Sequence, residues 1–510
     1  MPVRPSNDEI IPVAIIGGGA GAICLGAQLG KVGIPYVVFE KSARLGGTWR
    51  ENIYPGAASD NPSHQYSYSF ELNPDWSRVF AEQPELLAYF QHTADKYGVS
   101  ANVRLNTEVF AAVYEESSGL WRIDTSAGEA SARCLVSAVG QLNRPAVPRF
   151  KGMDCFQGKM FHSAQWDANH DLTNKRIAVI GTGASAVQLI PPVAARAQRL
   201  TIFQRTPNWI QPRGDRFYKP YEKWFFRHIP FAGRLYRYLI YWALERDWSS
   251  FVKDTSAAKL KERQLTEEIH AQASMSMVND LTPRYAVGCK RVLLADDYYD
   301  TLKRANVEVV TSPIQCFEAN AILTDDAKRY PIDTCVLATG FHATEFLMPM
   351  RIEGRAGLAL HDRWKDGAEA YLGMSVSGFP NFFMMYGPNT NLGHNSIIFM
   401  LECQARYIIQ CLKLIFKHDL LSFEVTSEAM VRYNQATQSL LAKMAWTGNC
   451  DSWYKKTAHA RVINNWPGTT PAYFWRTLRP VVGDYDMRPR SGLPENRQKD
   501  CADYAWNTCL

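Results

Sequence analysis

Short apolar segments that end in glycine alternate with helical apolar spacing along this chain. Residues 13–16 are apolar and mostly β-branched, residues 17–22 read GGGAGA, and the apolar positions that follow have helical spacing. A second apolar segment, residues 36–39, ends at Glu40. This order predicts a strand, a tight turn, a helix and a second strand, the repeating unit of parallel α/β sheets.

The glycines of this first unit have the spacing of a dinucleotide-binding turn. Gly17 is expected to make the turn, Gly19 to let the backbone approach a pyrophosphate, and Ala22 to allow close packing of helix on strand. The start of the helix then faces the phosphates. Glu40 lies where an acid that binds a ribose is expected. A purely structural glycine turn is the alternative, and the order of elements argues against it.

A second unit of the same kind follows in residues 177–203, with the letters GTGASA at its turn. Gly181, Gly183 and Ala186 take the three corresponding positions. The chain is therefore predicted to hold two dinucleotides.

The residue after the second strand distinguishes the two units. The first unit has Glu40, whereas the second has Arg205 followed by Thr206. A carboxylate suits a free ribose diol, and a guanidinium suits a 2′-phosphate. We therefore predict FAD at the first turn and NADP at the second. An ordinary surface arginine is the alternative for Arg205.

The expected fold class is α/β, with two Rossmann-like dinucleotide-binding domains, for FAD and NADP, and a helical insert. The predicted parts are an FAD-binding domain in residues 1–145 and 344–510, the latter with the C-terminal segment, an NADP-binding domain in residues 146–210 and 289–343, and the insert in residues 211–288.

The insert is rich in aromatic and basic residues at helical spacing. Residues 224–248 mix aromatic side chains with Arg227, Arg234, Arg237 and Arg246. Two interpretations are open: a helix that packs over the substrate pocket, which we favour, and a helix that lies on a membrane surface.

Composition places the chain among large folded proteins. It has 510 residues, of which 46% are hydrophobic, 21% charged and 12% aromatic. A net charge of +6 spread over this length gives no expectation of nucleic-acid binding. The longest stretch without acidic or basic residues, 370–401, contains Pro380 and Pro388, so no transmembrane span is expected.

The cysteines and the N-terminal sequence favour a reducing compartment. None of the eleven cysteines forms a CxxC pair or has the histidine spacing of a zinc site, so we expect reduced thiols and no metal. The N-terminal sequence lacks the features of a secretion signal. The expected location is the cytoplasm.

Several other chemistries are disfavoured by the motifs. Residues 183–187, GASAV, lack the second glycine of a hydrolase nucleophile elbow, and neither HExxH nor a Walker A lysine motif is present. No paired redox cysteine accompanies the flavin unit. Oxygen is then the natural electron acceptor, which leaves oxidase and monooxygenase chemistry open.

A motif between the two glycine turns narrows this choice. Residues 156–167 read FQGKMFHSAQWD, or FxGxxxHxxxWD, in which the defining residues are Phe156, Gly158, His162, Trp166 and Asp167. This motif resembles the fingerprint of type I Baeyer–Villiger monooxygenases. Their nitrogen- and sulfur-oxidising relatives usually lack the Trp-Asp or Trp-Pro ending. Further matches are Gly46-Gly47-Thr48-Trp49, Tyr54-Pro55-Gly56 to Asp60, Gly288-Cys289-Lys290-Arg291, Ala338-Thr339-Gly340-Phe341, and Trp446-Thr447-Gly448-Asn449 to Trp453-Tyr454.

The resemblance implies roles for individual residues. Arg291 would point at the flavin, Asp60 would contact that arginine, and Lys290 would meet the NADP 2′-phosphate. Such a fixed positive charge suits the oxyanions of ketone oxygenation. His162 is assigned to coupling NADP binding with domain movement, and a general base is the alternative. Trp453 would lie near the nicotinamide, and a core aromatic is the equal alternative.

Other residues complete the expected cofactor sites, and one departs from the family. The additional residues are Gly47, Thr48, Trp49, Tyr66 and Gly387. Polar residues 389–396 precede a helical pattern whose start could face the flavin pyrimidine ring. The family commonly has Ala-Arg-Cys-Asp where this chain has AASD at residues 57–60, so the arginine is lost and the acid is kept.

The resemblance implies an FAD-containing, NADPH-dependent monooxygenase that forms a peroxyflavin and converts a ketone into an ester or lactone. The expected partners are molecular oxygen and a small lipophilic ketone, with peripheral membrane contact left open. The rival hypotheses are a monooxygenase of sulfur or nitrogen compounds and a flavoprotein that binds NADPH without oxygenating a substrate.

Overall fold

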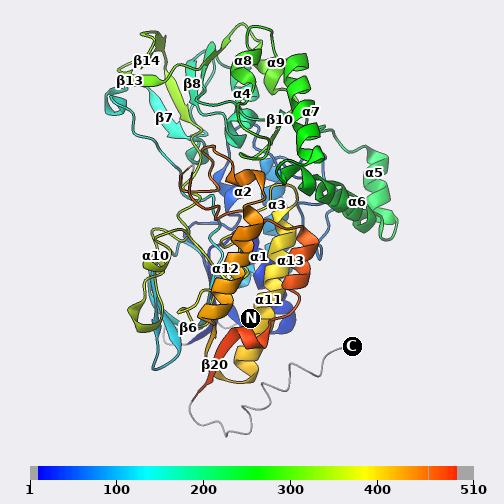
Figure 1. Cartoon of the computed structure of the whole chain (residues 1–510), viewed down its shortest axis with the longest axis vertical. Coiled ribbons are helices and arrows are strands. Elements are labelled where there is room, and N and C mark those ends of the chain that lie inside the picture. Colours follow the sequence, from blue (N-terminus) through cyan, green and yellow to red (C-terminus); the bar gives the residue numbers. More distant parts are fainter. Residues whose placement is uncertain (1–9, 458, 491–510) are drawn as a thin grey trace.

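The computed structural model describes residues 10–457 and 459–490, whose two largest sheets each have helices around them (Figure 1). The strands of the first sheet are β1 (Ile11–Ile16), β2 (Tyr36–Phe39), β3 (Val103–Arg104), β4 (Val109–Glu115), β5 (Leu120–Thr125), β6 (Gly128–Ser137), β17 (Arg351–Glu353) and β18 (Phe382–Met384). Their order is β17-β4-β5-β6-β1-β2-β3, and β18 pairs with β6. The β4-β5-β6 pairs are antiparallel, and the other pairs are parallel.

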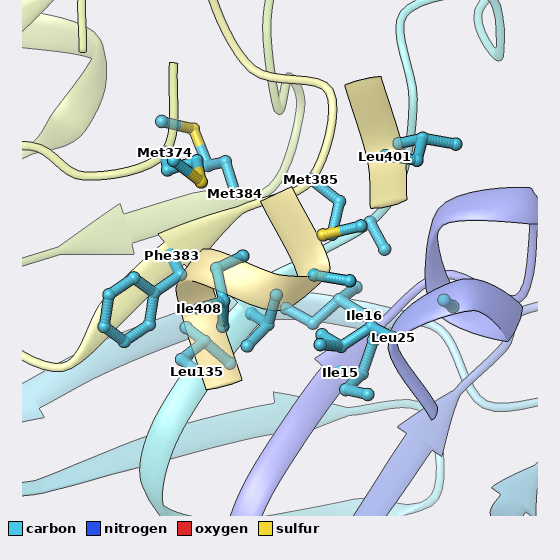
Figure 2. Close-up of a cluster of buried hydrophobic side chains, with 14 of the residues drawn as sticks. Ile15, Ile16, Leu25, Leu135, Met374, Phe383, Met384, Met385, Leu401 and Ile408 are labelled. Carbon is cyan, nitrogen blue, oxygen red and sulfur yellow. The ribbon is translucent and has the colours of Figure 1, made fainter. Parts of the chain in front are cut away.

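Helices from both ends of the described chain cover this sheet. They are α1 (Ala20–Val32), α2 (Thr48–Glu51), α3 (Gln83–Lys96), α10 (Leu360–Arg363), α11 (Ile397–Lys417), α12 (Ser427–Leu441) and α13 (Thr470–Arg476). A two-stranded antiparallel ribbon of β19 (Leu420–Val425) and β20 (Tyr485–Pro489) lies beside them. Figure 2 shows the shared core, in which Ile15 and Ile16 of β1, Leu25 of α1, and Leu401 and Ile408 of α11 come together. The segment after residue 344 therefore completes the first domain.

The second sheet is smaller and entirely parallel. Its strands are β7 (Lys159–His162), β8 (Arg176–Ile180), β9 (Arg199–Phe203), β12 (Val307–Val310) and β16 (Thr334–Leu337), in the order β12-β9-β8-β16-β7. Nearby elements are α4 (Ala184–Ala194), α9 (Tyr298–Leu302), the antiparallel strands β13 (Ile314–Glu318), β14 (Ala321–Thr324) and β15 (Arg329–Pro331), and the pair β10 (Ile210–Gln211) and β11 (Leu293–Leu294).

The segment between β10 and β11 is helical, as its apolar spacing predicts. It contains α5 (Pro220–His228), α6 (Ala232–Arg246), α7 (Ser256–Gln272) and α8 (Val278–Leu281). Helices α5 and α6 project from one side of the molecule (Figure 1). Within the residues described, no helix is both long and apolar enough to span a bilayer.

The two sheets repeat the same strand-to-helix turn. Gly17 has φ +96°, and its N–H donates to the Phe39 carbonyl oxygen at 2.8 Å. Gly181 has φ +110°, and its N–H donates to the Phe203 carbonyl oxygen at 3.1 Å. A Cβ atom would lie 2.9 Å from the Ala138 carbonyl oxygen in the first turn. Both the dihedral angle and the missing space therefore require glycine.

Candidate active site

One large cavity joins the two glycine turns. Its volume is about 1400 Å³, above the roughly 300–1,000 Å³ of an ordinary small-molecule pocket. The lining includes residues 17–21 of the first turn and 181–185 of the second, together with Asp60 and Arg291. Because both turns open into the same space, two bound dinucleotides would meet there.

At the first turn, two glycines leave the backbone open to the cavity, without side chains. Gly19 precedes α1 and Gly47 precedes α2, and a Cβ atom on Gly47 would lie 2.8 Å from the Gly19 Cα atom. Glu40 is buried, and its carboxylate accepts hydrogen bonds from the Gly18 N–H at 2.6 Å and the Ser42 N–H at 2.9 Å. These bonds hold the carboxylate at the cavity wall, where the sequence predicts a ribose ligand. The site therefore fits a dinucleotide with a free ribose diol.

The second turn combines open space with positive charge. A Cβ atom on Gly183, the residue before α4, would have no neighbour within 4 Å. Lys290 lies beside the turn and donates from Nζ to Thr206 Oγ1 at 3.1 Å. Burial, and to a lesser extent the charge of Arg205, lowers the pKa of Lys290. Two neighbouring cations at a dinucleotide turn fit an additional phosphate group.

The small residues of the two helices pack as the sequence predicts. Ala22 in α1 and Ala186 in α4 are fully buried. Neither residue lines the cavity, so their contribution is to bring helix and strand together behind each turn.

Arg291 and Asp60 form an ion pair in the cavity wall. Arg291 donates from Nε at 2.9 Å and from Nη2 at 2.5 Å to the same Asp60 Oδ2 atom. Their side chains are 26% and 34% exposed, because both face the cavity. The negative charge of Asp60 raises the pKa of Arg291 further above its already high ordinary value. The cavity thus has a cation that stays charged at any physiological pH.

Aromatic residues surround this ion pair. Trp49 donates from Nε1 to the Tyr66 hydroxyl oxygen at 3.1 Å, and burial raises the pKa of Tyr66 to about 12. The Tyr386 hydroxyl donates to Asn391 Oδ1 at 2.7 Å. Burial raises the pKa values of Tyr386 and Tyr454, and the positive charge of nearby Arg291 opposes this effect. The sequence predicted no role for either tyrosine, and the signal for Tyr386 was its position directly before Gly387 and Pro388.

The place of the missing family arginine is occupied by a contact between the two domains. Ala58 is buried, and its carbonyl oxygen accepts a hydrogen bond from Gln188 Nε2 at 2.9 Å. The Tyr54 hydroxyl donates to Gln188 Oε1, also at 2.9 Å. Gln188 belongs to α4, so this contact ties the segment that carries Asp60 to the second sheet. No sequence pattern indicated Gln188.

The fingerprint residues lie away from the cavity. The rings of Phe156 and Phe317 are 6.0 Å apart, and a Cβ atom on Gly158 would lie 2.5 Å from the Asp333 carbonyl oxygen. Trp166 packs edge-on against Phe161. Asp167 Oδ2 forms a salt bridge with Lys159 Nζ at 2.8 Å. All of these contacts are within the second domain.

His162 is buried behind the cavity wall. Its Nδ1 atom accepts a hydrogen bond from the Ala164 N–H at 3.1 Å, and burial lowers its pKa. Its ring contacts Phe341, which lines the cavity. Because His162 itself does not line the cavity, this position gives no support to a general base.

The C-terminal segment contributes part of the wall. Trp453 is half-buried: it lines the cavity, and its ring packs against Tyr454 with the ring centroids 4.8 Å apart, so its place near the nicotinamide stays a prediction. The residues before α11, including Asn391 and Asn395, line the cavity as well. Gly387 does not: a Cβ atom there would lie 2.3 Å from the Gly373 carbonyl oxygen, so its place reflects close packing.

The helical insert does not reach the cavity. None of the described residues 211–288 belongs to the lining. Helix α6 instead contacts the layer behind it, where Glu245 accepts a hydrogen bond from Asn395 Nδ2 at 2.8 Å. The insert therefore packs behind the cavity wall, and the favoured interpretation of a helix that packs over the substrate pocket stays a prediction.

Two cysteines are paired, which corrects the expectation that all are reduced. Cys289 and Cys450 form a disulfide across 161 residues of sequence. The pair joins the residue before Lys290 to the segment that carries Trp453. The free cysteines in the described ranges are Cys24, Cys134, Cys155, Cys316, Cys335, Cys403 and Cys411, and Cys501 and Cys509 lie outside the described residues. The spacing rule failed because folding, not sequence proximity, brings the two thiols together.

Comparisons with known proteins match this architecture over nearly the whole chain. Residues 11–352 match the flavin-binding monooxygenase-like family. A Pseudomonas aeruginosa protein named Baeyer-Villiger monooxygenase is 41% identical over 486 residues, 94% of this chain and 91% of that protein. The closed crystal structure of cyclohexanone monooxygenase matches with TM-score 0.86 and 25% identity, covering 94% of this chain and 100% of that chain. OTEMO in complex with FAD and NADP matches with TM-score 0.84 and 28% identity, covering 94% and 99%.

The chain belongs to the flavin-binding monooxygenase-like family. The structural matches, the parallel strand pairs of the two large sheets and their glycine turns also confirm the predicted α/β class, with two Rossmann-like dinucleotide-binding domains and a helical insert.

Proposed function

We propose that this chain is an FAD- and NADPH-dependent monooxygenase that converts a ketone into an ester or lactone, the Baeyer–Villiger reaction. The observation that carries the proposal is the Arg291–Asp60 ion pair in a cavity shared by two glycine turns. The name of the Pseudomonas aeruginosa relative supports the same reaction.

The two turns divide the cofactors between them. Gly17, Gly19 and Glu40 would hold FAD, in a domain formed by residues 1–145 and 344–510. A second set, Gly183, Arg205 and Lys290, would hold NADPH in residues 146–210 and 289–343, with the insert in 211–288. The OTEMO complex with FAD and NADP supports the presence of both cofactors in one protein of this fold.

FAD, when bound, would supply the redox chemistry, namely acceptance of a hydride from NADPH and activation of dioxygen for transfer of one oxygen atom. The protein must then stabilise the negative charge that develops on the ketone oxygen. Arg291 can do so because it faces the cavity and cannot lose its proton. Asp60 fixes the orientation of the guanidinium through two hydrogen bonds. Arg291 is thus the proposed catalytic residue, and Asp60 positions it.

The substrate is proposed to be a small lipophilic ketone. Part of the cavity wall consists of the apolar segment Leu347-Met348-Pro349-Met350, and Leu142 and Val147 lie on the wall as well. Such a lining favours apolar substituents around a single polar carbonyl.

The fingerprint, which includes His162 beside Phe341, is proposed to transmit nicotinamide binding to the domain junction.

Product analysis tests the proposal. Purified protein would be supplied with FAD and NADPH, and offered linear, cyclic and aryl ketones and an aryl sulfide. Formation of esters or lactones with equimolar NADPH consumption is expected. If sulfoxide is formed and no ketone gives an ester, the protein is a sulfur oxygenase. Oxygen uptake without any oxygenated product would exclude both.

A further inference from the structure

The outer surface of α5 and α6 exposes large apolar side chains. Ten of them, at least 39% exposed, come from one short stretch of the chain: Phe217, Tyr221, Trp224, Phe225, Ile229, Phe231, Leu235, Tyr238, Leu239 and Trp242. We call these residues the hairpin surface. Scattered exposed apolar residues are ordinary, but a concentration of this size in 26 consecutive positions marks an interaction site.

Helical spacing places much of the hairpin surface on one side of α6. Phe231, Leu235, Tyr238, Leu239 and Trp242 are separated by four, three, one and three positions. This spacing is that of a single stripe along an α-helix. The helix pair also projects from the body of the protein (Figure 1). The stripe is therefore continuous and accessible.

The inner side of the hairpin already has its partners. Phe226 and Tyr236 pack around the buried His64, with ring centroids 4.5 and 5.2 Å away. Arg237 donates from Nη2 to the Ser67 carbonyl oxygen at 3.1 Å. Glu245 accepts hydrogen bonds from the N–H and hydroxyl of Thr470. These contacts fix the hairpin to the protein without using the outer apolar residues.

The charges around the hairpin surface have one predominant sign. Residues 216–246 contain seven arginines and lysines: Arg216, Lys219, Lys223, Arg227, Arg234, Arg237 and Arg246. The only acids in this range are Glu222 and Glu245. Glu222 is neutralised by Arg216 at 2.7 Å, and Glu245 is buried. In the described part of the chain, Lys219, Arg234 and Arg246 have no carboxylate partner within 4.0 Å.

We infer that the hairpin surface docks the protein on an anionic lipid bilayer. Exposed Trp and Tyr side chains beside Arg and Lys form the combination that favours the interface between lipid headgroups and acyl chains. Positive charge at such a surface attracts anionic lipids. Since no described helix can span a bilayer, the hairpin would lie in the surface plane.

A second copy of this chain fits the surface less well. A twofold contact would bring two copies of the same cationic patch together, because both copies would use the same surface. Such repulsion is absent when the facing surface is anionic. Charge complementarity therefore selects the bilayer as the occupant.

Docking would bring the lipid surface close to the reaction cavity. Glu245 in α6 holds Asn395, which lines the cavity. The helix that would contact the bilayer is thus linked to the cavity wall by a direct hydrogen bond. The docking itself depends on the hairpin alone and does not require the proposed ketone chemistry.

Vesicle flotation of the FAD-loaded protein tests the inference. The probes are vesicles of pure phosphatidylcholine and vesicles with one third phosphatidylglycerol. Protein is expected to float with the anionic vesicles and to dissociate as salt is raised. The triple substitution Trp224→Ser, Phe231→Ser and Leu239→Ser should weaken binding at least about tenfold, because three apolar side chains no longer enter the lipid.

A matched variant controls for the loss of apolar surface elsewhere. Met275, Val431 and Leu440 are also exposed but lie outside α5 and α6. Their simultaneous replacement by serine should leave flotation unchanged.

Replacing Lys219, Arg234 and Arg246 by glutamine should weaken binding to anionic vesicles by about fivefold for each charge. The flavin spectrum and circular dichroism of every variant verify folding.

Three outcomes would overturn the inference. The first is no flotation of the wild-type protein with anionic vesicles at low salt. The second is equal loss of binding in the hairpin variant and the control variant. The third is a concentration-dependent dimer, seen by sedimentation, that the hairpin substitutions dissociate while vesicle binding is absent, since the occupant would then be a second copy. None of these readouts depends on oxygenase activity.

Discussion

The two glycine turns of this protein have the same backbone geometry and opposite charge. In each, a glycine with positive φ follows a buried strand and donates its N–H to the next strand, and the helix begins three residues later at Ala20 or Ala184. The first turn has the Glu40 carboxylate beside it, whereas Lys290 and Arg205 accompany the second.

The difference shows how one fold can serve two nucleotides. The turn and helix start are suited to phosphates in general. In the proposed assignment, discrimination depends on one or two side chains of each unit, which would meet the ribose or its 2′-phosphate. The proposed reaction site, at Arg291 and Asp60, lies where both units open into the cavity.

The largest expected effect comes from Arg291, the cation in the cavity into which both turns open. Arg291→Ala should lower ester formation by about 10²–10³, the usual loss when one stabilising group is removed from a preorganised site. NADPH should still reduce the flavin under anaerobic conditions, and oxygen should then yield hydrogen peroxide. Product, peroxide and flavin reduction are measured on the same preparation.

Arg291→Lys is the control for this substitution. It keeps the charge but loses the two-nitrogen contact with Asp60, so an intermediate rate is expected. Substantial ester formation by Arg291→Ala would show that another group stabilises the developing charge.

The second effect should be confined to the second turn. Arg205→Gln combined with Lys290→Gln removes two charge-assisted hydrogen bonds of about 1.5–3 kcal/mol each to the 2′-phosphate. The preference for NADPH over NADH should fall by roughly 10² or more. Arg199→Gln, at the far end of strand β9, is the control and should leave the preference unchanged. Equal weakening of NADPH and NADH would contradict the assignment.

A smaller effect is expected at the first turn. Glu40→Gln replaces an ionised hydrogen-bond acceptor of the FAD ribose by a neutral one, at a cost of about 1.4 kcal/mol, or tenfold in FAD affinity. Loss of yellow colour on dilution and the FAD dissociation constant measure this change. Unchanged FAD affinity would remove Glu40 from the FAD site.

The smallest expected effect is on stability, and it tests the backbone geometry of the second turn independently of nucleotide binding. Gly181→Ala should lower the free energy of unfolding by at least about 1–2 kcal/mol, because alanine is strained at φ +110° and its Cβ would meet the Ala338 carbonyl oxygen. Gly183→Ala has open space around it and should leave stability nearly unchanged. Chemical denaturation compares the two. Similar stability of both variants would contradict the account of the turn.

Local sequence patterns were sufficient to predict the two turns and the insert. Strand, turn and helix are neighbours in sequence, so the positive φ at Gly17 and Gly181 follows from short-range rules. The Arg291–Asp60 pair lies 231 positions apart, and its prediction depended on family resemblance, since no spacing rule could bring the two residues together.

Long-range packing accounts for what the sequence did not reveal. The contact of Gln188 with Ala58 and the pairing of Cys289 with Cys450 both arise only when distant segments fold together. Gly387 was assigned to a cofactor, whereas its surroundings show close backbone packing. The fingerprint motif, which identified the family most clearly, lies behind the cavity wall at His162 rather than in the site.

The division of cofactors between the turns is tested most directly by one crossed measurement. Wild type, Glu40→Gln and the Arg205→Gln, Lys290→Gln double variant would be compared for FAD dissociation and for the ratio of NADPH to NADH constants in anaerobic flavin reduction. Glu40→Gln should change only FAD dissociation, and the double variant should change only the ratio. The reverse pattern, in which Glu40→Gln alters the nicotinamide preference and the double variant releases FAD, would show that the two turns are assigned the wrong way round.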